Sequence, residues 1–279
     1  MHEVRFKGSR RALLGSGAAA LAMLAAARLP LGVREAAAQE GLAPSLAIDL
    51  TSEPATLDPA LTYEIDGWSV VHSIYDAPVQ LGPAGVLQMV AAESLEQADP
   101  LTWDLKLKPG ITFHNGEPLD SSSVTFSVEH IKNPDTASQI SGNFAVIESV
   151  EEVDELTARF HLSAPAPWLP SQLAPWLALL PPKYAADPAN DFALNPIGTG
   201  PYVFKGWERG SSVALERNAE YFGGDAKGTP IADVVTFRFV MDGTTRVADL
   251  ISGTSQIVSG VPFDQVPEVE SSATMQAVP

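Results

Sequence analysis

The histidines and carboxylates are the residues with the greatest chemical potential, and their spacing argues against a catalytic or metal-binding centre. No histidine pair has the H-x₃-H spacing of a zinc site, and no acidic D-x-D-x-D-G loop of a calcium site is present. The sequence also lacks cysteine and the G-x-S-x-G, G-x-x-x-x-G-K-[ST] and H-E-x-x-H motifs. We therefore predict no catalytic residue, no metal and no cofactor. We expect solitary surface or edge histidines at His2, His72, His114, His130 and His161.

The five tryptophans are the next candidates, because aromatic rings line many ligand clefts. Large apolar side chains are nevertheless more often part of a core. We expect Trp103 and Trp207 to be core residues.

Residues 195–202, with the sequence NPIGTGPY, predict a sharp backbone corner followed by a strand. The two prolines fix φ and remove hydrogen-bond donors, whereas the two glycines permit conformations that other residues avoid. We expect a structural role here, with Gly200 in a conformation forbidden to β-branched residues.

Four segments resemble family 5 extracytoplasmic solute-binding proteins, the dipeptide, oligopeptide and nickel receptors of ABC importers. The corner belongs to a P-x-G-T-G-P-Y…E-R-N-x-x-Y-[FW] signature, and the other segments occur in the expected order. The chain departs from the family pattern at 254–257, where relatives have an acidic ending. The matching segments are 53–60, 107–119, 195–222 and 242–253.

The resemblance implies a mixed α+β fold, the two-lobe type II fold of periplasmic binding proteins. Relatives are longer, so we expect an N-terminal fragment that contains lobe one, an extra small β-rich subdomain and only the start of lobe two. The hinge should lie near Ser259 and Gly260. The expected segments are 1–38 as signal peptide, 42–83 and 191–259 as lobe one, 84–190 as the inserted subdomain and 260–279 as the start of lobe two.

The resemblance also implies a ligand site. In relatives the region after E-P-x-T-L-D-P reaches the cleft, where extended peptides add as a strand to exposed backbone. The alternative is an ordinary loop before a helix. A second loop, 134–139, resembles one that lies beside the ligand in oligopeptide receptors. The candidate ligand-binding residues are Tyr63, Glu64, Ile65, Asp66, Gly67, Ser138 and Gln139.

The first 38 residues have the pattern of an export signal. A basic start is followed by an uncharged, mildly apolar run and by small residues suited to cleavage before Gln39. Arg10 and Arg11 lie in a segment that resembles the twin-arginine motif; an ordinary Sec signal is the alternative. The apolar run is shorter than a membrane span. With no cysteine to carry a lipid, we expect a free periplasmic protein.

Periodicity predicts a strand over 46–50, a helix over 66–75 with Trp68, Val71, His72 and Tyr75 on one apolar face, and a half-exposed strand around Trp103. It then predicts a tight turn at 115–116 and a helix capped by residue 120 or 121 that ends before residue 134. Residues 144–162 form a hairpin, 164–184 an irregular connection, 202–215 two strands, 234–240 a strand, and 242–253 a helix with a glycine cap.

Together these patterns predict a binding protein that delivers a peptide or peptide-like solute to an inner-membrane ABC permease without catalysis. The formal charge of −17 argues against nucleic acid as a partner, and we expect a monomer. Nickel chelates, sugars, opines and glutathione are alternative solutes. An exported hydrolase and a chaperone-like binding domain without a permease are the alternative classes.

Overall fold

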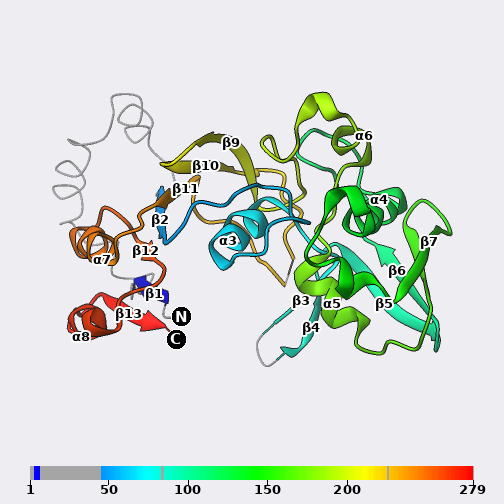
Figure 1. Cartoon of the computed structure of the whole chain (residues 1–279), viewed down its shortest axis with the longest axis horizontal. Helices are drawn as coiled ribbons and strands as arrows, with labels where there is room; N and C mark the ends of the chain where they lie inside the picture. Colours follow the sequence, from blue (N-terminus) through cyan, green and yellow to red (C-terminus); the bar gives the residue numbers. More distant parts are fainter. Residues whose placement is uncertain (1–2, 7–44, 83–84, 225, 279) are drawn as a thin grey trace. The chain divides into compact units, whose positions relative to one another are not determined.

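The computed structural model describes residues 3–6, 45–82, 85–224 and 226–278. The predicted signal peptide lies outside these residues except for the strand at 3–6. The chain divides into two compact units, one made of 1–51 with 231–279 and the other of 52–230 (Figure 1).

The first unit is built on a mixed sheet. Within it the strand order is β13-β1-β12-β2-β11. β2 runs parallel to both β11 and β12, whereas β1 is antiparallel to β12 and β13. The strands are β1 (Glu3–Phe6), β2 (Leu46–Leu50), β11 (Val234–Phe239), β12 (Ile257–Val258) and β13 (Met275–Val278).

A crossover helix joins the parallel strands β11 and β12, as parallel pairing requires. Helix α7 (Gly243–Ser252) begins where the Asp242 carboxylate accepts the Thr245 backbone N–H at 2.8 Å, and it ends at Gly253 with φ 75°. The predicted helix and its glycine cap are confirmed. Two further short helices follow, η7 (Phe263–Gln265) and α8 (Val266–Glu270). The core of this unit contains Val247, Leu250, Val258, Val261, Val269 and Met275.

Arg246 of α7 ties the loops that follow β11 and β12 to the helix. It is 4% exposed, and its guanidinium donates to the backbone oxygens of two residues in each loop. The arginine thereby supplies donors to backbone oxygens just beyond the ends of the two strands. The acceptors are Val240, Met241, Ser259 and Gly260 at 2.6–2.9 Å.

The second unit contains a four-stranded antiparallel sheet with the order β5-β6-β8-β7. In β6 the buried Trp103, Leu105 and Leu107 alternate with half-buried Asp104 and exposed Lys106, which confirms the predicted half-exposed strand. The strands are β5 (Ala92–Asp99), β6 (Thr102–Leu107), β7 (Ile147–Glu152) and β8 (Thr157–Leu162).

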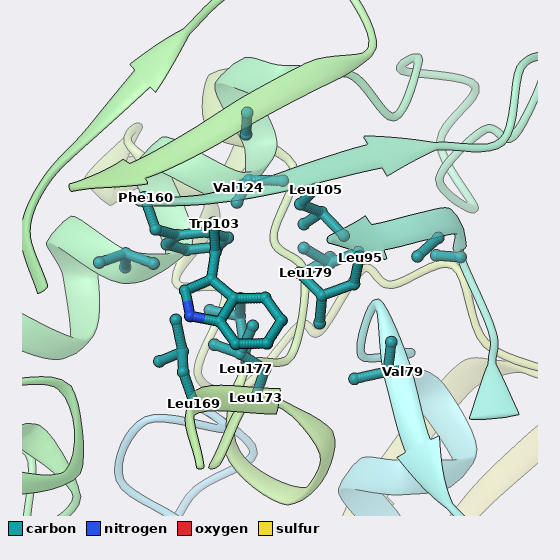
Figure 2. Close-up of a cluster of buried hydrophobic side chains, with 14 of the residues drawn as sticks. Val79, Leu95, Trp103, Leu105, Val124, Phe160, Leu169, Leu173, Leu177 and Leu179 are labelled. Carbon is teal, nitrogen blue, oxygen red and sulfur yellow. The ribbon is translucent and has the colours of Figure 1, made fainter. Parts of the chain in front are cut away.

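The buried face of this sheet forms the larger core of the unit. Figure 2 shows the Trp103 indole beside Leu169 and Leu173 of helix α5 (Leu169–Trp176) and beside Leu177, the residue that follows this helix. Trp103 is 9% exposed, so the prediction of a core tryptophan is confirmed here.

Helix α4 (Ser121–Lys132) packs against β7 and β8. The Asp120 carboxylate accepts the backbone N–H groups of Ser122 and Ser123, which satisfies donors that the helix itself leaves free. The inward side chains are Val124, Val128 and Ile131, as predicted.

The remaining elements of this unit are short, apart from α3, β9 and β10. They are α3 (Ile65–Ile74), β3 (Val79–Leu81), β4 (Leu87–Met89), η4 (Pro134–Thr136), η5 (Ser141–Phe144), α6 (Pro182–Ala185), η6 (Pro188–Asn190), β9 (Tyr202–Glu208) and β10 (Ser212–Arg217).

The corner at 195–202 packs its glycines against the C-terminal end of α3. The Gly200 N–H donates to Ile74 O at 2.8 Å. His114 holds the other side: its Nε2 lies 3.0 Å from Gly200 O, and its Nδ1 accepts the Gly198 N–H at 3.4 Å. The scaffold role is confirmed, but its cause is close backbone approach, because Gly200 does not have a positive φ.

Asp76 connects this corner to the segment after β10. Its side chain is completely buried, and Oδ1 lies 2.6 Å from Lys227 Nζ. Thr199 Oγ1 donates to its Oδ2 at 3.1 Å and the Tyr221 hydroxyl to its Oδ1 at 3.3 Å. The buried carboxylate therefore has the partners that its charge requires.

Three expectations about local structure are wrong in whole or in part. The predicted helix is present as α3, and Val71 and Tyr75 are buried as expected. Trp68 is only half-buried and His72 is exposed, because Val70 and Ile74 complete the buried face. The connection 164–184 is not irregular throughout, because it contains α5. Pro170 is tolerated in this helix because it lies in the first turn, where a backbone N–H would have no acceptor within the helix. Trp207 is only half-buried, and its contacts are polar or charged: its Nε1 donates to Glu53 Oε1 at 2.9 Å, and the Arg209 guanidinium lies over its ring.

The described histidines lie at exposed or half-buried positions, as expected of surface or edge residues. Each described histidine has a polar partner, and three of the four partners are supplied by the fold rather than by the sequence neighbourhood. The partners are Pro175 O for His72, Gly200 O for His114, Asp58 for His130 and Glu151 for His161.

Candidate ligand-binding site

The candidate site begins in a rigid loop that leads into α3. Asp58 Oδ1 accepts the Ala60 N–H, and its backbone oxygen accepts the N–H and the hydroxyl of Thr62. Thr62 O in turn accepts the Trp68 indole N–H at 3.1 Å. These bonds hold the loop so that Tyr63 projects from it, 53% exposed.

The first turn of α3 closes tightly around Glu64. A Cβ added to Gly67 would lie 2.7 Å from Glu64 Oε1 and 2.6 Å from Thr62 Cγ2, so a side chain there would require these two side chains to move. Glu64 Oε2 accepts the Tyr63 N–H, and Asp66 Oδ2 accepts the N–H and hydroxyl of Ser52. The two carboxylates lie near the helix N-terminus, where negative charge is favourable.

An exposed aromatic ledge extends from this loop, made of Tyr63, Trp68, His72 and Trp176. The Tyr63 and Trp176 rings stack with centroids 5.6 Å apart and an angle of 5°. Trp68 meets Trp176 edge-on at 4.3 Å and stacks on His72 at 5.2 Å. The ledge offers flat apolar faces with polar edges, a surface suited to planar or apolar groups of a ligand.

Ser138 and Gln139 differ in their surroundings. The buried Ser138 hydroxyl donates to Ala60 O at 2.5 Å and accepts the Ile140 N–H, so it fastens its loop to the Tyr63 loop. The Gln139 side chain is exposed beside it. The structure thus brings the two predicted segments together through Ala60.

The Asp58–His130 pair strengthens the same junction. His130 Nε2 lies 2.9 Å from Asp58 Oδ2, and its Nδ1 lies 3.4 Å from the Thr136 hydroxyl. Both loops are therefore anchored on α4, which leaves Tyr63 and Gln139 on a preorganised surface.

A pocket of about 250 Å³ adjoins the ledge. His72 belongs to both, because its ring stacks on Trp68 and also lines the pocket. The lining residues are His72, Tyr75, Ala77, Val79, Gln80, Leu81, Val90, Ala174, Pro175 and Lys227.

Sequence reasoning identified Tyr63 but not the rest of the ledge. Trp176 is far from Tyr63 in the sequence and reaches it only because α5 forms, and α5 was not predicted. The available signal was the run of proline, leucine and tryptophan at 164–184, which is unusually apolar for a connection. Among residues 45–82, 85–224 and 226–278 no group of three or more histidines and carboxylates is arranged to hold a metal ion.

The fold is that of the type II periplasmic binding proteins. The family described as bacterial extracellular solute-binding proteins, family 5, middle part, matches residues 86–277. The chain belongs to this family, whose members are binding proteins of the solute-import type.

Relatives at moderate identity carry different named ligands. The glutathione-binding protein GsiB of Pectobacterium atrosepticum is 29% identical over 225 residues, which cover 80% of this chain and 43% of that protein. The PBP AgaA from A. tumefaciens R10, in complex with agropinic acid, has a TM-score of 0.77 at 29% identity. The match covers 82% of this chain and 46% of the AgaA chain.

A third neighbour is NikZ from Campylobacter jejuni in complex with Ni(L-His), with a TM-score of 0.68 at 27% identity; the match covers 76% of this chain and 42% of NikZ. The chain thus spans less than half the length of these relatives. Within the part of the chain that the structure describes, no helix combines the length and apolar character needed to cross a membrane.

Proposed function

We propose that this chain is part of the solute-binding component of an ABC importer and that it binds a peptide or peptide-like solute for delivery to an inner-membrane permease. The observation that carries the proposal is the aromatic ledge at Tyr63, which includes the loop for which the family resemblance implies a ligand site. The proposed contacts are Tyr63, Glu64, Ile65, Asp66, Gly67, Ser138 and Gln139.

Six of these seven residues divide into two roles in the proposal, and the seventh, Glu64, is half-buried. Tyr63, Ile65 and Gln139 are exposed and can touch the solute directly. Asp66, Gly67 and Ser138 are buried and act by holding the loops in position. Binding then proceeds without catalysis, and closure of two lobes on the solute selects the form that the permease recognises.

We further propose that the protein works as a monomer in the periplasm after export by the twin-arginine pathway. The absence of cysteine supports a protein without a lipid anchor, and the charge of −17 supports a partner other than nucleic acid. Glutathione, opine and nickel-chelate solutes are the competing choices, since relatives carry those names.

The test uses the protein from the complete gene. Native mass spectrometry identifies solute that copurifies, and thermal melting is measured with di- to pentapeptides, glutathione, an opine and nickel–histidine. A peptide at 100 times its Kd should stabilise by about 2.7 kcal/mol, which raises Tm by several degrees, with no peptide hydrolysis. Peptide turnover would favour the hydrolase, and a shift with only a non-peptide solute would favour that solute class.

A further inference from the structure

The pocket beside the ledge is too small for a complete solute and has a mostly apolar wall. Ligand sites for complete small molecules usually have volumes of about 300–1,000 Å³, whereas this pocket has about 250 Å³. Its size therefore suits one group of a larger molecule. The apolar wall consists of Ala77, Val79, Leu81, Val90, Ala174 and Pro175.

Two polar side chains on the wall, Lys227 and Gln80, have already used their hydrogen-bond donors. Lys227 Nζ has three acceptors, which match its three N–H bonds: Asp76 Oδ1 at 2.6 Å, His72 O at 3.2 Å and Tyr75 O at 3.4 Å. A carboxylate or carbonyl group that entered the pocket would have to displace one of these acceptors.

Gln80 is satisfied in the same way. Its amide nitrogen donates to Gln88 Oε1 at 2.9 Å and to Ala226 O at 2.6 Å, which uses both N–H bonds. Burying an unpaired acceptor here would be costly, whereas burying an apolar group is favourable. Lys227 and Gln80 therefore offer no further donor to a polar group in the pocket.

The pocket continues directly from the ledge. His72 joins the two, since its Nε2 lies 3.3 Å from Pro175 O, and Pro175 precedes Trp176 of the ledge. We propose that the pocket is a subsite for an aliphatic side chain of the solute, while the rest of the solute lies along the ledge. The inference rests on the proposed function and specifies the solute further.

Calorimetry on the protein from the complete gene tests the preference. The probes are tripeptides of alanine in which each position in turn is leucine or asparagine, two side chains of similar size. At one position leucine should bind about 10- to 100-fold more tightly than asparagine. Equal affinity at every position would overturn the proposal.

Two matched variants locate the effect. Ala77→Leu fills the pocket and should weaken the leucine peptide about tenfold while it leaves the asparagine peptide within about twofold. Ala219→Leu, at an exposed position outside the lining, should change neither. Equal losses for both peptides in Ala77→Leu would contradict the subsite.

A probe that does not depend on peptide binding separates the two proposals. Isobutanol carries the leucine side-chain group, and methyl NMR with assignments for Val79, Leu81 and Val90 reports its entry. Selective shifts in these methyls, lost in Ala77→Leu, would support the subsite even if no peptide bound, in which case only the peptide function would fail. No selective shift would overturn the subsite even if peptides bound.

Discussion

We predict that Gly200→Ala, which adds a single methyl group at the corner, destabilises the protein. A Cβ at this position would lie 2.5 Å from Ile74 O, 2.6 Å from Ile74 C and 2.8 Å from Ser73 O. Real Cβ atoms essentially never approach other atoms closer than 3.0 Å. All three atoms belong to the backbone of α3, so relief requires the corner and the helix end to move apart.

The cost of Gly200→Ala follows from two terms. Overpacking in a well-packed region costs about 1–3 kcal/mol. The displacement also weakens the Gly200 N–H bond to Ile74 O, and a hydrogen bond of this kind is worth about 0.5–1.5 kcal/mol. We expect a loss of about 2–4 kcal/mol in the free energy of unfolding, and a larger loss for Gly200→Val.

Urea unfolding followed by tryptophan fluorescence measures this loss. Gly142→Ala is the matched control, because nothing lies within 4 Å of the added carbon and the glycine φ is not positive. The control should change stability by less than about 0.5 kcal/mol. If Gly200→Ala were as harmless as the control, the close approach of the corner to α3 would be refuted.

Three further changes test the scaffold and the export signal. Asp76→Ala removes the carboxylate that balances the Lys227 charge and accepts from Thr199 and Tyr221, and should cost about 3–5 kcal/mol in urea unfolding, whereas Asp76→Asn should cost less; equal, small losses would contradict the ion pair. Burial lowers the pKa of His114, so its contribution to stability is complete above about pH 6.5 and is lost as pH falls through the lower folded pKa. In His114→Gln the free energy of unfolding should depend less steeply on pH between pH 7 and 4.5. An unchanged slope would contradict a lowered pKa for His114 in the folded protein. Replacing Arg10 and Arg11 by lysine should retain precursor in the cytoplasm in fractionation, and equal periplasmic yield would indicate the Sec route.

Local patterns were sufficient for the elements that depend on one face and one cap. The structure shows the predicted alternation around Trp103. It also shows the predicted cap at Asp120, with Val124 on the buried face of the helix that follows. In each case the deciding interactions lie within a few residues, so the sequence carries them directly.

Long-range partners could not be predicted in this way. Asp76 is an ordinary acidic residue in the sequence, and only the fold brings Thr199, Tyr221 and Lys227 to its carboxylate. Trp68 also followed helical spacing, but the ledge keeps it half-exposed because Trp176 supplies an aromatic partner at the surface. Periodicity cannot distinguish this arrangement from burial in a core.

The most direct test of the central claim is calorimetric titration of the protein from the complete gene with the solute that copurifies with it. Tyr63→Ala removes the exposed ring of the ledge and should weaken binding at least about tenfold without turnover of the solute. Leu101→Ala is the control: it removes an apolar side chain that is 43% exposed and lies between β5 and β6, and it should leave the Kd unchanged. An unchanged Kd in Tyr63→Ala would contradict the ledge as the binding surface.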